Sequence, residues 1–65
     1  MNIRKMIETG LAESGMTNAE LADKMDIHQA SISNMKKQKA LRPPTMKAMA
    51  DAFGLSVSEF IKLGE

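Results

Sequence analysis

The sequence predicts an all-α domain of five short helices, and three observations lead to this fold class. Apolar residues recur every three or four positions in successive segments, which places them on one face of a helix. Glycine, proline and capping residues separate these segments, and no stretch shows the alternating pattern of a strand. The chain has 65 residues, so we expect one domain over residues 1–65, near the smallest size at which a hydrophobic core alone holds a fold.

The first helix is predicted by its apolar stripe and by the glycine that follows it. Four apolar residues share one face at helical spacing: Ile3, Met6, Ile7 and Leu11. Gly15 is suited to end the helix, because glycine readily adopts the left-handed conformation found after many helices. Gly10 lies inside the same segment and is expected to weaken the helix by up to ~1 kcal/mol.

The second helix is predicted by a capping box. From Thr17 to Glu20 the sequence reads T-x-x-E, in which the hydroxyl and the carboxylate accept hydrogen bonds from free backbone N–H groups, so the helix begins near Asn18. It should end at Asp26, because a short polar residue tolerates a left-handed turn. Three residues form its expected buried stripe: Leu21, Ala22 and Met25.

The third helix follows after only about three residues. We expect it to run from about Gln29 to Lys37, with Ile32 and Met35 facing inward. Two helices joined by so short a turn cannot lie antiparallel and must cross steeply, which is the geometry of a helix-turn-helix. Such a crossing needs a large side chain in the core and a small one where the helices approach closely, and Leu21 and Ala22 fit these two positions. Ile27 can fill the corner between the helices, and Ile32 can pack the third helix onto the second.

The last two helices follow a proline-containing segment. We expect Arg42-Pro43-Pro44 to be a loop, because proline disfavours helix at the residue before it and supplies no N–H. Thr45 would then cap a fourth helix that ends at Gly54, and a second capping box, from Ser56 to Glu59, would open the fifth. The apolar residues of these two helices are expected in the core: Met46, Met49, Ala50, Phe53, Val57, Phe60 and Ile61.

Composition argues against several classes of protein. The chain has no cysteine and one histidine, so we expect neither a disulfide framework nor a metal site, and no cofactor. No apolar run approaches the roughly 20 residues of a membrane span, and the N-terminus lacks the apolar stretch of a secretory signal. We therefore expect a cytoplasmic protein. The seven methionines are assigned to the core and not to a peptide-binding groove, because they recur at helical spacing in a small domain.

Charge is distributed unevenly along the chain. The net charge is only +1, but the stretch from Ile27 to Ala50 carries five basic residues and no acidic one. The remainder holds four basic and eight acidic residues. A basic run is more often plain solvated surface, so the charge indicates a function only together with other features.

The third helix has a polar outer face. Its outward positions are Gln29, Ala30, Ser33, Asn34 and Lys37. A helix fits the major groove of DNA, where amides pair bidentately with adenine, serine pairs with several bases and a small apolar side chain touches the thymine methyl. Exposed helices also carry such residues for solubility alone, but the steep helix pair and the adjacent basic stretch favour DNA binding.

The pattern resembles a known family, the lambdoid-phage repressor and Cro type of helix-turn-helix domain (Cro/C1-type, XRE-like). The resemblance covers nearly the whole chain, from about Ile3 to Ile61. The matching residues are Thr17-Asn18-Ala19-Glu20-Leu21-Ala22, Ile27, Ile32-Ser33, Arg42-Pro43 and Ala50-Asp51-Ala52-Phe53-Gly54-Leu55-Ser56. It implies a lambda-repressor-like DNA-binding domain of five helices, in which the second and third form the helix-turn-helix.

The polar face and the resemblance together indicate roles for individual residues. Those expected to read bases are Gln29, Ala30, Ser31, Ser33 and Asn34. Those expected to contact phosphates are Thr17, Asn18, His28, Lys36, Lys37, Lys39 and Arg42. By the resemblance, Asn18 stands where a glutamine commonly contacts phosphate and braces the reading helix. His28 stands at the N-cap of the third helix, where it either reaches a phosphate or is an exposed turn residue without a partner.

The sequence departs from the family pattern at several positions. Asp26 replaces a frequent turn glycine and places a negative charge near DNA. Lys36 and Leu11 replace a glutamate and an arginine that can pair in the family, so both partners of that ion pair are absent together. Pro44 replaces a basic residue that reaches the minor groove in close relatives, and Arg42 is the residue that could substitute for it.

These observations predict a sequence-specific transcriptional regulator that binds double-stranded DNA, a small phage or prophage repressor of the Cro kind in a bacterial cell or phage-infected host. The resemblance implies a homodimer on a (pseudo)palindromic operator, with reading helices about 34 Å apart. It suggests a dimer contact through residues 39–44 and through Ser56, Val57 and Phe60. We expect no small-molecule ligand.

Two other classes of protein are alternatives. The same fold can serve as a protein-interaction module such as an antitoxin, but that class needs an extra element to wrap the toxin, and we expect none with four residues after Ile61. An enzyme is the weakest alternative, and we assign no catalytic residue. His28, Asp26 and Ser31 lie on a short turn and helix start with no pocket implied, and a catalytic triad is recognised by geometry.

Overall fold

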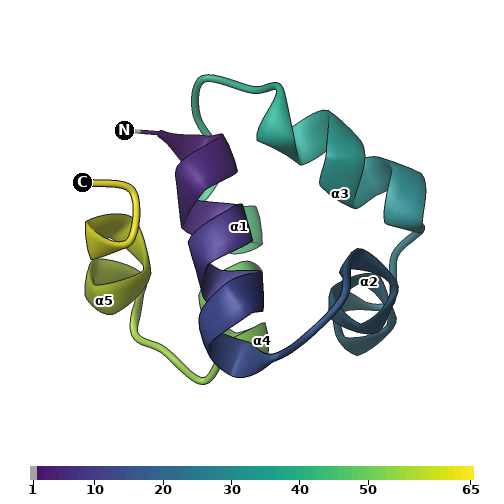
Figure 1. The fold of residues 1–65 in the computed structure, drawn as a ribbon. Helices are drawn as coiled ribbons and strands as arrows, with labels where there is room; N and C mark the ends of the chain where they lie inside the picture. The colour runs from purple at the N-terminus through teal and green to yellow at the C-terminus, as the bar shows by residue number, and fades with distance from the viewer. Residues whose placement is uncertain (1) are drawn as a thin grey trace.

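Five α-helices follow one another along residues 2–65, the part of the chain that the computed structural model describes (Figure 1). Their bounds are α1 Ile3–Ser14, α2 Asn18–Met25, α3 Gln29–Lys36, α4 Pro43–Ala52 and α5 Val57–Lys62. α1 packs against α3 and α5, and α4 packs against α2 and α5. In Figure 1, α5 lies on one side of α1, and α2 and α3 lie on the other. The predicted all-α fold is confirmed.

The predicted starts of α2 and α5 and the predicted end of α2 form as expected. At the start of α2, the Thr17 hydroxyl accepts a bond from the Glu20 N–H (3.2 Å), and the Glu20 carboxylate accepts one from the Thr17 N–H (3.1 Å). Ser56 and Glu59 make the same pair of bonds at the start of α5, at 3.1 and 2.9 Å. Asp26 has φ 57° and is the only residue other than glycine with positive φ in residues 2–65. Its backbone therefore ends α2 in the left-handed conformation.

The core draws side chains from every helix. Its buried residues within the described chain are Ile3, Met6, Ile7, Leu11, Leu21, Ala22, Ile32, Met46, Met49, Ala50 and Phe60. Each of these was expected inside from its position on a helical stripe. The other predicted core residues are only partly buried and pack against this cluster: Met25, Met35, Phe53, Val57 and Ile61. The rings of Phe53 and Phe60 lie 5.6 Å apart, centroid to centroid.

Gly10 has a packing role that its place in the helix did not reveal. The residue is buried in α1. A Cβ atom at Gly10 would lie 2.7 Å from Cε2 of Phe53, which is closer than real Cβ contacts come. Because glycine has no side chain, the Phe53 ring can approach the backbone of α1. Gly10 therefore lowers the helix propensity of α1 but allows close packing against Phe53.

The predicted loop over Arg42-Pro43-Pro44 is correct for Arg42 but wrong for the two prolines, and the predicted cap at Thr45 is wrong. α4 begins at Pro43, both prolines lie in its first turn, and Arg42 is the N-cap residue with extended backbone (ψ 146°). The N–H groups of a first helical turn have no partner within the helix, so proline loses no hydrogen bond there, and its fixed φ suits the helix. The predicted end of the third helix is one residue late, because Lys37 is the C-cap of α3.

Candidate DNA-binding surface

The turn between α2 and α3 is held by a small apolar corner. Leu21 and Ile32 are fully buried there, and the partly buried Ile27 packs against the core. The Ile27 N–H donates to the Ala22 carbonyl at 3.0 Å, which fixes the chain just after the left-handed Asp26. In Figure 1 the two helices leave this turn in different directions. The predicted helix-turn-helix corner is therefore present.

The predicted reading face of α3 is exposed. All five residues of the reading stripe are on the surface: Gln29, Ala30, Ser33, Asn34 and Lys37. Ser31 is half-buried, so it is less accessible than the stripe. On the opposite side, Ile32 is fully buried and Met35 partly so. The helix thus turns its apolar residues inward and leaves amide, hydroxyl and methyl groups outward.

A hydrogen bond joins the end of the reading helix to the start of α2. The Lys36 ammonium donates to the Asn18 side-chain oxygen at 3.2 Å, and both residues are half-buried. Asn18 was expected to brace the reading helix, and this bond supplies a brace. The sequence predicts a phosphate contact for Lys36 but not its bond to Asn18, because the two residues are 18 positions apart in the chain.

The N-terminus of α3 lacks a side-chain cap. His28 is the N-cap residue, it is exposed, and its side chain makes no capping hydrogen bond. In the backbone, the Ser31 N–H donates to the His28 carbonyl at 3.0 Å. A helix N-terminus carries partial positive charge, so this exposed first turn can face an anion.

The other predicted phosphate contacts lie at two places around the reading helix. Thr17 is exposed and Asn18 half-buried at the start of α2. Lys37, Lys39 and Arg42 are exposed at the end of α3 and in the segment that leads to α4. Polar groups therefore lie at the start of α2, and exposed cations lie at the end of α3 and just beyond it.

One residue of the expected dimer contact is ruled out by its burial. Phe60 has no exposed surface, and its ring is part of the core beside Phe53. Its expected role in a dimer contact is therefore wrong, since a buried ring cannot contact a second subunit. Ser56 is exposed and Val57 half-buried, so these two neighbours remain on the surface.

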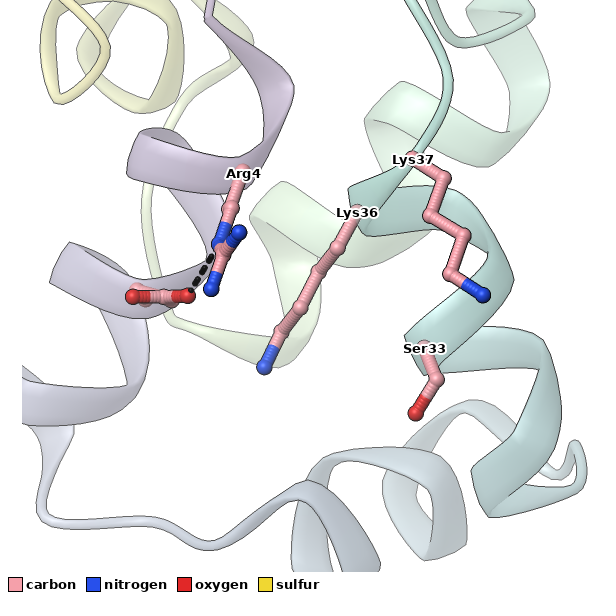
Figure 2. Close-up of a pocket in the computed structure, with 5 residues that line it drawn as sticks. Arg4, Ser33, Lys36 and Lys37 are labelled. Atoms are coloured by element: carbon pink, nitrogen blue, oxygen red, sulfur yellow. Dashed lines mark hydrogen bonds and ion pairs between the residues drawn. The ribbon is translucent and has the colours of Figure 1, made fainter.

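A charged cavity between α1 and α3 was not predicted. It has a volume of about 210 Å³ and is lined by Arg4, Glu8, Ser33, Lys36 and Lys37 (Figure 2). Arg4 Nε donates to the Glu8 carboxylate at 2.8 Å. This bond, with a smaller contribution from Lys36, lowers the pKa of the Glu8 carboxyl below its ordinary value. The i,i+4 spacing of Arg4 and Glu8 could have indicated their pairing, but only the fold shows that Lys36 lies nearby.

The structure also bears on metal sites and on membrane-spanning helices. Within residues 2–65, no three side chains of the metal-binding types lie together. In the same residues, no helix combines the length and apolar character that would allow it to cross a membrane.

The helix-turn-helix class of DNA-binding domains is defined by two short helices that meet at a buried corner. The second helix has an exposed polar face, and basic residues lie around that face. The family model described as Helix-turn-helix, HTH_3, matches residues 5–60. The chain belongs to this family of Cro/C1-type, XRE-like domains, and it is a DNA-binding transcription regulator of that type. Comparisons with curated proteins and with solved structures gave no match.

Proposed function

We propose that this protein is a sequence-specific repressor of the Cro kind, from a phage or prophage, which binds its operator with α3 in the major groove. The observation that carries the proposal is the exposed reading stripe on a helix whose opposite side is anchored by the buried Ile32. Gln29 and Asn34 supply amides for adenine, and Ala30 supplies a methyl group for thymine. Ser33, and the half-buried Ser31 to a lesser extent, supply hydroxyl groups.

Phosphate contacts would fix the register of the reading helix on the duplex. Lys37, the last residue of the stripe, and Lys39 and Arg42 beyond it are exposed cations. The first turns of α2 and α3 add backbone N–H groups. In the proposed complex, Thr17, Asn18, His28 and Lys36 contact phosphate as well. These contacts strengthen binding to every sequence, whereas the base-reading residues of α3 choose among sequences.

The proposed assembly is a homodimer on a (pseudo)palindromic operator in the cytoplasm. Two-fold symmetry would place two reading helices in successive major grooves, about 34 Å apart along the DNA. The surface proposed for the dimer contact is residues 39–44 together with Ser56 and Val57, without Phe60.

Selection from random-sequence duplexes tests the proposal directly. We expect an enriched palindrome with half-sites one helical turn apart. Gln29→Ala and Asn34→Ala should each weaken the selected site by about 1–3 kcal/mol and relax base preference at one position per half-site. Lys37→Ala is the matched comparison, because loss of a phosphate contact should weaken all duplexes alike and reduce the salt dependence.

Two outcomes would contradict separate parts of the proposal. An equal loss on selected and random DNA for Gln29→Ala would remove its role in reading bases. Transcription in vitro from a promoter that overlaps the selected site should fall when the protein is added. A rise in transcription would contradict the assignment as a repressor.

A further inference from the structure

We infer that the cavity between α1 and α3 binds a backbone phosphate of the operator and that Arg4 is its principal ligand. The inference rests on the proposed function and deepens it, because it adds a contact from α1 to a surface otherwise built from α2, α3 and the segment after α3. Arg4 stood outside every expected set of DNA-binding residues. Three features support it: the position of the cavity, its charge and the geometry of Arg4.

The cavity lies beside the face that enters the groove. Two of its lining residues, Ser33 and Lys37, also belong to the reading stripe. A helix in the major groove has a phosphate strand on each side, because the groove is only about 12 Å wide. A strand on the α1 side of α3 would therefore pass the opening of this cavity.

The cavity has an excess of positive charge. Arg4, Lys36 and Lys37 line it together with one carboxylate, that of Glu8. A glutamate carboxyl is ionised at neutral pH, so the Glu8 carboxylate balances only one of the three cations. In Figure 2 the side chains of Arg4 and Lys36 reach from facing helices into the space between α1 and α3. A phosphate would balance the remaining charge.

The bond to Glu8 orients Arg4 for an anion. It uses the Nε group of the guanidinium, at 2.8 Å from the carboxylate oxygen. The two terminal Nη groups make no hydrogen bond within residues 2–65, and a guanidinium presents such groups as a fork that fits phosphate oxygens. The Arg4 side chain is 73% exposed, so the ion pair contributes little to stability and the fork is accessible to DNA.

The salt dependence of DNA binding tests the inference. In Arg4→Ala, affinity for both the selected and a random duplex should fall roughly 3–10-fold at low salt. The slope of log K against log salt should become shallower by about 0.9 for each subunit bound, or about 1.8 for the dimer on its operator. Arg4→Lys should keep most of the slope, because charge is retained, but not all of the affinity. Lys62→Ala is the matched control. It removes one positive charge from α5, on the side of α1 away from α3 (Figure 1), and should leave the slope unchanged.

The outcomes separate this inference from the proposed function. If Arg4→Ala keeps the wild-type slope while Gln29→Ala still loses sequence preference, the phosphate site is refuted and the proposed function stands. A second outcome is that Gln29→Ala keeps its sequence preference, while the salt slope becomes shallower in Arg4→Ala but not in Lys62→Ala. Base reading by Gln29 is then refuted and the phosphate site stands. Titration with inorganic phosphate, followed by NMR, separates two sources of the anion. Shifts at Ser33 and Lys37 that vanish in Arg4→Ala, without any change in DNA slope, would identify a site for free anions and overturn the assignment to DNA.

Discussion

α1 and α3 are held in the molecule in different ways. Within the described chain, α1 buries four hydrophobic side chains and Gly10, whereas α3 buries Ile32 alone. The Asn2 side chain accepts a bond from the Lys5 N–H at 3.1 Å and caps α1, but no side chain caps the start of α3. An eight-residue helix is not stable in isolation. The comparison shows that α3 leaves most of its surface exposed and buries a single side chain, that of Ile32, whereas α1 is anchored by several.

The largest expected effect comes from removing the single buried anchor of α3. Ile32→Ala should lower the free energy of unfolding by about 2–5 kcal/mol, because it leaves a cavity in the core. Hydrogen exchange of backbone amides should show that α3 loses protection first. The control is Ile7→Ala in α1, which makes the same isoleucine-to-alanine change at a buried position and should lower protection throughout the core. Uniform loss of protection in both variants would contradict the difference between the two helices.

The next effect concerns the close contact between α1 and Phe53. Gly10→Ala should reduce the free energy of unfolding by about 1–3 kcal/mol, because the new Cβ would overlap the ring, although alanine favours helix by roughly 1 kcal/mol. Chemical denaturation measures the change. Ala12 lies in the same helix but is exposed, so Ala12→Gly should lower the free energy of unfolding only by the difference in helix propensity, about 1 kcal/mol. Stabilisation by Gly10→Ala would show that the ring moves aside without cost.

A smaller effect, of opposite sign, is expected at the uncapped start of α3. His28→Ser should raise the free energy of unfolding by about 0.5–1 kcal/mol, because a serine hydroxyl can accept a bond from an N–H of the first turn. Thr17→Ala, which removes an existing cap from α2, should lower it by about 1 kcal/mol. Thermal unfolding of both variants measures the two changes. If His28→Ser left stability unchanged, the missing side-chain cap would not limit the stability of α3.

The smallest effect is a loss of stability in acid. The Ser56 N–H and hydroxyl lower the pKa of the Glu59 carboxyl from its ordinary 4.5 in the folded protein. A lowered carboxyl pKa contributes stability that is present above about 4.5 and is lost as the pH falls through the folded value. In Glu59→Gln the side chain still offers an oxygen acceptor at the cap of α5, but the glutamine amide does not ionise. The melting temperature of the variant should therefore fall less steeply with acid than that of the wild type.

Most helix boundaries could be predicted because each depends on residues a few positions apart. The capping boxes at Thr17 and Ser56 and the left-handed Asp26 are such local features, and all are confirmed. The start of α4 differs from the prediction because both prolines lie in the first helical turn, where proline does not break a helix.

The sequence by itself determined the five-helix class, the inward and outward faces of α3 and membership of the helix-turn-helix family, because periodicity and caps act between neighbours in the chain. Only the tertiary structure decided that Phe53 lies against Gly10 and that Lys36 bonds to Asn18. These contacts join segments far apart in the chain. They depend on how side-chain volumes fill the space between helices, which local patterns do not specify.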